Sequence, residues 1–132
     1  MDQIQFEVRH HELYCHIKSY GDRNNSNELF NGTDQLYDII LQCGYPYVIA
    51  DYSDVVFTLN FPDVFNIIRY YERKLPSMKG ITMAGVVNEK NMEIALYWEK
   101  LSNIKGYEFK VFVSLEDAVQ WITEKRNMVE DY

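Results

Sequence analysis

Apolar residues alternate with polar ones over residues 4–8 and again over residues 13–17. A period of two is typical of a strand with one buried face. The connection His10-His11-Glu12 is short and polar, so the two segments predict an antiparallel hairpin. Residues 21–27 then concentrate turn formers without an apolar anchor, and this predicts a solvent-exposed loop.

Two segments with helical spacing follow. The first begins with Ser26 or Asn27 as its N-cap and ends at Gly44, a suitable C′ residue. The second has Pro62 at its first positions and ends before Pro76. Their apolar stripes are Leu29, Phe30, Thr33, Leu36, Tyr37, Ile40 and Leu41 in the first, and Val64, Phe65, Ile67, Ile68 and Tyr71 in the second. Each stripe predicts an amphipathic helix with one buried face.

Three short apolar segments, residues 47–50, 81–87 and 109–113, have the length and composition of strands. The first is almost entirely apolar, which is typical of a parallel strand covered on both faces. Asn88 is suited to cap a helix that ends at Gly106, and Ser114 to cap a last helix. Their predicted buried stripes are Ile94, Tyr97, Trp98, Leu101 and Ile104, and then Leu115, Ala118, Val119 and Ile122. Residues 127–132 show little pattern and are expected to fray.

This order predicts an α/β fold: an initial β-hairpin, then alternating helices and strands in a mostly parallel sheet of four to five strands with about four helices. With 132 residues, the chain fits one domain spanning residues 1–132. The residues are 47% hydrophobic, which is enough to form a core.

Charge and cysteine content narrow the functional classes. A net charge of −7 disfavours nucleic acid and anionic membrane surfaces as partners. No apolar run reaches the length of a signal peptide core or a membrane span, so we expect a cytoplasmic protein without membrane insertion. Cys15 and Cys43 have apolar or aromatic neighbours and are interpreted as buried free thiols.

The segment Val48-Ile49-Ala50-Asp51-Tyr52-Ser53-Asp54-Val55-Val56-Phe57 resembles the central strand and turn of STAS domains, the anti-sigma-factor-antagonist fold, where D-L-S-x-V-x-F precedes D-S-S-G. Residues 109–122 are similar to the end of the STAS-like branch that is grouped with CRAL-TRIO lipid-transfer folds. The resemblance covers nearly the whole chain. It implies the fold and a tendency to bind proteins or small ligands.

The same resemblance places D-S-S-G on Leu59-Asn60-Phe61-Pro62, so Phe61 stands at the position of the regulated serine. The phosphorylation switch of the family is therefore absent. Ser53 matches a family serine that is usually structural.

Polar groups gather after the predicted parallel strands, at the edge where open α/β sheets bind ligands. The candidate binding residues are Asp51, Tyr52, Ser53, Phe57, Thr58, Asn60, Phe61, Asn88, Asn91 and Trp98. The helix N-termini at Pro62 and Asn88 could also hold an anion. The alternative is that Asn60 and Asn88 only cap helices, while Asp51 and Ser53 only satisfy the backbone of a turn.

Catalytic and metal chemistry find little support. His10, His11, His16 and Cys15 are metal-ligand types, but Cys15 and His16 are strand neighbours with opposite directions, and His10 and His11 lie in the expected turn. We therefore predict no metal site. Asp51 stands at the end of a central strand, as the aspartate of a phosphorelay receiver domain does. The acidic pair that receiver domains need after the first strand to bind magnesium is missing here. There is no G-x-S-x-G, H-E-x-x-H or phosphate-binding glycine loop, so we predict no catalytic residues and no cofactor.

Aromatic residues make up 15% of the chain, and some are expected at the surface. The sequence thus predicts a non-catalytic interaction module with a protein partner, including itself as a homo-oligomer. The alternative is a carrier of a small apolar or amphipathic ligand, in a cavity of several hundred Å³ lined by Phe57, Phe61, Tyr71 and Trp98.

Overall fold

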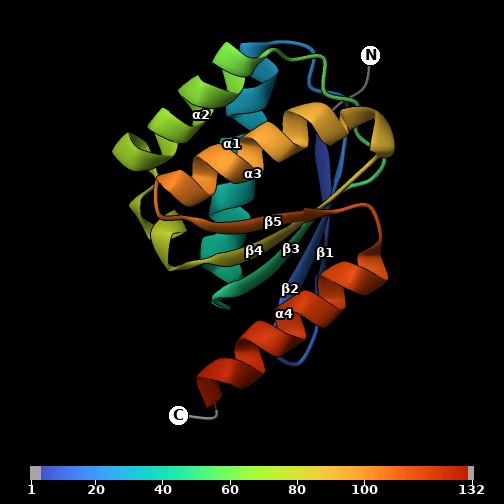
Figure 1. The fold of residues 1–132 in the computed structure, drawn as a ribbon, viewed down its shortest axis with the longest axis vertical. Helices are drawn as coiled ribbons and strands as arrows, with labels where there is room; N and C mark the ends of the chain where they lie inside the picture. Colours follow the sequence, from blue (N-terminus) through green and yellow to red (C-terminus); the bar gives the residue numbers. More distant parts are fainter. Residues whose placement is uncertain (1–3, 131–132) are drawn as a thin grey trace.

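The structure, a computed structural model that describes residues 4–130, is built on a five-stranded sheet with the strand order β1-β2-β3-β4-β5 (Figure 1). The strands are β1 (Gln5–His10), β2 (Cys15–Tyr20), β3 (Tyr47–Tyr52), β4 (Thr82–Val87) and β5 (Glu108–Phe112). β1 and β2 form the expected antiparallel hairpin, and β2 to β5 are mutually parallel. β3 is therefore the central strand, as the sequence predicted.

Helices cover both faces of this sheet (Figure 1). They are α1 (Ser26–Cys43), α2 (Phe61–Lys74), α3 (Met92–Ile104) and α4 (Leu115–Glu130), with short 3₁₀ helices η1 (Pro76–Gly80) and η2 (Glu89–Asn91). α1, α2 and α3 lie on one face and α4 on the other. The α/β class and the β-α alternation are confirmed.

Residues of β3 alternate between these two faces. Val48 and Ala50 are fully buried in the larger core, with α1 and α2. Ile49 is fully buried on the other face, where it belongs to a smaller core with Ala118 and Ile122 of α4. Because both faces are covered, a strand without polar alternation is stable in this position.

Local capping sets the helix boundaries. Asn25 caps α1 by accepting a hydrogen bond from the Glu28 amide, one residue before the predicted caps. Gly44 ends α1 as predicted, with a left-handed φ of 74°. Asn60 and Asp63 form a reciprocal capping box at α2. The expected helix after Asn88 begins instead as η2, and α3 follows from Met92.

The loop of residues 21–27 differs from the expectation of full solvent exposure. Arg23 is only 2% exposed, and it forms an isolated parallel bridge with Phe57. Its guanidinium lies against α1, where a Cβ at Gly32 would be 2.7 Å from Arg23 Nε. The loop is therefore anchored by a buried arginine rather than by an apolar side chain.

Two other expectations need correction. Residues 127–130 continue α4 rather than fray, and residues 131–132 lie outside the described residues. Not every apolar residue of the predicted stripes is buried: the exposed ones are Leu41, Phe65, Ile104 and Leu115. These four residues extend the periodic pattern beyond the width of the face that the sheet and neighbouring helices cover.

Candidate functional site

Asp51, near the carboxyl end of β3, is the centre of a buried hydrogen-bond network. Its Oδ2 accepts a hydrogen bond from His16 Nε2 at 2.9 Å. Its Oδ1 accepts bonds from the Ser53 amide at 3.0 Å and from Ser53 Oγ at 2.7 Å. Burial alone would raise the pKa of Asp51, but the bonds from His16 and Ser53 lower it to about 2. Both carboxylate oxygens are thus used within the protein.

Asn60 and Asn88 have the capping roles of the alternative interpretation. Asn60 Oδ1 accepts a bond from the Asp63 amide, and Asn88 Oδ1 accepts one from the Lys90 amide. The Asp63 carboxylate occupies the N-terminus of α2, where Oδ2 accepts from the Asn60 amide and Oδ1 from Ser26 Oγ. An anion predicted at this helix end would face the negative charge of Asp63.

The loop between β3 and α2 is fixed from two sides. Asn91 is 4% exposed, and its side chain accepts from the Phe57 amide and donates to the Val55 carbonyl at 2.8 Å. On the other side, Arg23 bonds through its backbone to Val56 and Thr58. The loop therefore has backbone partners in two distant segments, which keeps its residues in one arrangement.

Arg23 is the structural residue that the sequence analysis missed. Its Nη1 donates to the carbonyl groups of Tyr20 and Gly21 at the exit of β2. Burial lowers its pKa, against an opposing effect of nearby Tyr52. The sequence held one signal: Gly32 lies on the buried face of α1, where it leaves room for a large side chain.

Behind this loop, aromatic rings line a small inner pocket between the sheet and α2 and α3. Phe57 packs edge-on against Tyr52 and Trp98, with ring centroids 5.3 and 6.2 Å apart. These rings and Tyr71 line a pocket of about 50 Å³. This volume is several-fold below the roughly 300 Å³ of small ligand sites. The expected cavity is therefore much smaller than predicted, and Phe61 is not part of its lining.

Phe61 instead lines an outer cleft of about 340 Å³, which we call the rim cleft. Its lining residues are Phe57, Leu59, Asn60, Phe61, Lys90, Glu93 and Ile94. Phe61 is 45% exposed, and its ring lies 4.6 Å from that of Tyr97 between centroids. Its lining residues place the rim cleft where the β3–α2 loop meets η2 and the start of α3.

The structure thus divides the ten predicted site residues among five settings. Asp51, Ser53 and Asn91 are hydrogen-bonded within the protein, Asn88 is a cap, Tyr52, Phe57 and Trp98 line the inner pocket, and Phe57, Asn60 and Phe61 line the rim cleft. Thr58 is exposed, and its amide bonds to the Arg23 carbonyl. The surface that is open to a partner is therefore about equally apolar and polar, with Lys90 and Glu93 as charged groups.

The arrangement matches solved structures at the level of the fold. The chain aligns with an anti-sigma factor antagonist from Mycobacterium paratuberculosis with a TM-score of 0.63 and 16% identity, covering 92% of this chain and 95% of the other. It aligns over the same shares with an uncharacterised protein from Shewanella loihica PV-4, described as having a SpoIIAA-like fold, with a TM-score of 0.56 and 17% identity. The chain has a SpoIIAA-like fold. The STAS resemblance seen in the sequence is confirmed for the fold.

Comparisons of the amino-acid sequence do not assign this SpoIIAA-like chain to a family. No protein-family model matches it, and no curated protein matches it. Within residues 4–130, no helix combines the length and the apolar character needed to cross a membrane.

Proposed function

We propose that this protein is a non-catalytic interaction module of the cytoplasm, which regulates a partner protein through contact at the rim cleft. The observation that carries this proposal is Phe61, a large apolar side chain that is 45% exposed beside a cleft of about 340 Å³. Exposed aromatic side chains at the centre of a concave surface are typical anchors of protein interfaces. The fold relative that is an anti-sigma factor antagonist supports a regulatory role.

The absence of catalysis is part of this proposal. Asp51 is a poor general base, because its pKa is lowered to about 2 and both of its oxygens already accept hydrogen bonds. Ser53 donates its hydroxyl to Asp51. Asn91 uses both ends of its amide to hold the loop. These groups hold the turn after β3 and the loop before α2 in place, rather than serve a reaction.

Phe61 also removes one form of regulation, phosphorylation at its own position, from the proposed module. The resemblance of the chain to STAS domains aligns Phe61, at the start of α2, with the phosphorylatable serine of that family. A phenyl ring accepts no phosphate, so the contact does not depend on phosphorylation at this residue. The ring adds apolar surface at the same place.

The chemistry of the cleft indicates what the partner offers. Leu59, Phe61 and Ile94 provide apolar contact, and Lys90 and Glu93 provide one charge of each sign. A partner that fits would insert an apolar side chain and pair polar groups with the two charges. This combination favours a protein over a nucleic acid, which the net charge of −7 would repel.

Site-specific photocrosslinking tests the proposal. A photoreactive residue at Lys90 should give a discrete adduct with one partner in the protein's own cells, and Phe61→Ala should reduce its yield by at least about 10-fold. The same residue at Ile104, which is 69% exposed at the far end of α3, is the matched control. Equal adducts from both positions, or an adduct unaffected by Phe61→Ala, would contradict a specific role of the cleft.

The partner at the rim cleft can also be a second copy of this chain, which gives a homo-oligomer. Light scattering then gives a dimer that Phe61→Ala converts to a monomer. A monomer at all concentrations excludes the homo-oligomer, and the crosslinked partner is then a different protein.

The carrier of a small apolar ligand stays a second prediction, with the apolar lining of the inner pocket as its support. With about 50 Å³, that pocket would need to open between the sheet and α3 to admit a ligand. Native mass spectrometry of protein from its own cells should then show a ligand adduct. A clean mass for the protein alone would contradict the carrier.

A further inference from the structure

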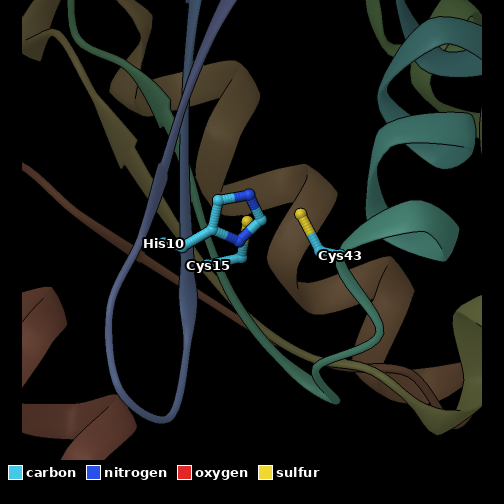
Figure 2. Close-up of side chains that lie close together, drawn as sticks. All are labelled: His10, Cys15 and Cys43. Atoms are coloured by element: carbon cyan, nitrogen blue, oxygen red, sulfur yellow. The ribbon is translucent and has the colours of Figure 1, made fainter.

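Three side chains with metal-binding chemistry lie together (Figure 2). They lie at the start of β2, whereas the rim cleft lies beyond the carboxyl ends of the parallel strands. They are His10, Cys15 and Cys43, and their ligand atoms all lie within 4.8 Å of one another. Figure 2 shows that the three residues come from β1, β2 and the end of α1 and point toward a common centre. We call this set the Cys15 cluster.

Strand register brings the first two residues together. The sequence placed His10 in the hairpin turn, but β1 extends to His10, which is directly opposite Cys15 in the antiparallel pair. Residues opposite each other in such a pair have their side chains on the same face of the sheet. His10 is exposed and Cys15 is fully buried, so the cluster reaches from the core to the surface.

The third residue comes from the end of a helix. Cys43 is the last residue of α1, and Gly44 with its φ of 74° ends the helix immediately after it. Cys43 is half-buried, and neither cysteine forms a disulfide. Within residues 4–130, no side-chain hydrogen bond or ion pair joins the cluster to a residue outside it. The two cysteines pack in the larger core, and His10 has a ring contact with Tyr45.

We propose that His10, Cys15 and Cys43 bind a thiophilic metal ion, with Zn²⁺ as the reference ion. Two thiolates and one imidazole are a ligand set that zinc sites use, and the fourth tetrahedral position is left to water. Binding releases the two thiol protons to solvent, and the two thiolates neutralise the charge of the dication. A neutral ligand set is compatible with the full burial of Cys15.

The distances need only a small adjustment. Zinc–sulfur bonds of about 2.3 Å in a tetrahedral site place two sulfur atoms about 3.8 Å apart. The ligand atoms of the cluster, within 4.8 Å, must therefore approach by no more than about 1 Å. His10 and Cys43 are the residues that move, because one is exposed on an edge strand and the other ends a helix.

This cluster differs from the set that the sequence suggested. His16 is committed to Asp51, and His11 stacks on Tyr14 with ring centroids 4.5 Å apart. Cys43 takes their place, although it lies far from the others in the sequence. The inference is independent of the proposed function, because none of its three residues lines the rim cleft.

Cobalt and zinc titrations of the reduced, metal-free full-length protein test the site. Co²⁺ should bind with a stoichiometry of one and give a sulfur-to-cobalt charge-transfer band, and Zn²⁺ should displace it. Cys43→Ser and His10→Ala should each weaken Zn²⁺ binding by at least about 10-fold. His11→Ala, one residue from the cluster, is the matched control and should bind as the unmodified protein does.

Circular dichroism and an assay of disulfide formation in air complete the test of the metal site. Circular dichroism of Cys43→Ser and His10→Ala should match that of the unmodified protein, because neither side chain is fully buried. Absence of the charge-transfer band from the unmodified protein would overturn the proposal, as would equal affinity of all variants. A Cys15–Cys43 disulfide that forms in air, without any cobalt spectrum under reductant, would overturn it too.

Discussion

Cys15 and His16 are neighbours in β2, yet they belong to two different regions of the molecule. His16 faces the side of the sheet that α4 covers, where its ring bonds to Asp51 at 2.9 Å and Asp51 in turn holds Ser53. Cys15 faces α1, beside His10 and Cys43. The first region has polar groups that already satisfy one another. In the second, the ligand groups have no side-chain hydrogen bond or ion pair, among residues 4–130, to a residue outside their own set.

This difference shows that position in a fold is not enough to identify a binding site. The carboxyl edge of a parallel sheet is where α/β proteins usually bind ligands. Here Asp51 and Asn91, the polar residues expected there, hold the structure of the loop. What the edge leaves open is the rim cleft, whereas three potential metal ligands lie together at the other end of β2.

The largest effect should come from removing one histidine from each of the two regions and comparing the loss of stability. His16→Ala leaves the buried Asp51 carboxylate without the hydrogen-bond partner of its Oδ2, and we expect the free energy of unfolding to fall by about 3 kcal/mol. His10→Ala, in metal-free protein, should change it by less than about 0.5 kcal/mol, because His10 is exposed. Urea denaturation measures both. Equal losses would mean that the two regions do not differ as the hydrogen bonds indicate.

The second prediction concerns Arg23, which connects the loop of the rim cleft to the exit of β2. Arg23→Met keeps most of the volume but removes the donors to the Tyr20 and Gly21 carbonyls, and should destabilise the protein by about 2 kcal/mol. Arg9→Met is the control, because Arg9 is largely exposed and should cost less than about 0.5 kcal/mol. Thermal unfolding measures the difference.

A complementary variant tests the packing of Arg23 from α1. In Gly32→Ala, the new methyl group would lie 2.7 Å from Arg23 Nε, so the guanidinium must shift. A Gly32→Ala protein as stable as the original would show that Arg23 is not held against α1.

The third prediction is a pH dependence of stability that comes from Asp51. Its folded-state pKa is lowered from 3.8 to about 2, so its stabilising contribution is present above pH 3.8 and is lost as the pH falls toward 2. The loss should be roughly 2 kcal/mol. Asp51→Asn removes a titrating group, so its stability should decline less steeply across this window. An identical decline in denaturant titrations at each pH would contradict the role of the carboxylate.

The sequence predicted features that depend on local pattern. The alternation of residues 4–8 and 13–17 identified the hairpin, and the apolar run before Asp51 identified the central strand. The cap at Asn60 was equally visible, because a capping box spans only four residues. Such features follow from hydrogen bonds between near neighbours in the chain.

The features that the sequence did not reveal depend on distant contacts. Arg23 is buried because Gly32 and the loop before α2 leave a space for it. The residues next to Arg23 in the sequence show no pattern that predicts its burial. Cys43 reaches Cys15 because of the length and end point of α1. The division between the inner pocket and the rim cleft likewise depends on how Phe57 packs against Trp98.

The smallest effect on stability is expected from a substitution at the rim cleft, and the same substitution should have the largest effect on partner binding. Phe61→Ala should lower the free energy of unfolding by about 1 kcal/mol or less, because the residue is 45% exposed and its ring pairs with that of Tyr97 near the surface. Ile68→Ala, on the same helix at a position only 1% exposed, should lower it by at least about 2 kcal/mol.

These two variants separate folding from binding. If the exposed ring of Phe61 serves a partner, Phe61→Ala remains folded and loses crosslinking at Lys90, whereas Ile68→Ala loses stability and retains crosslinking in its folded fraction. A loss of several kcal/mol in Phe61→Ala would mean that the ring belongs to the core. The cleft would then be an incidental surface, and the polar loop around Asp51 would have no exposed aromatic anchor to support.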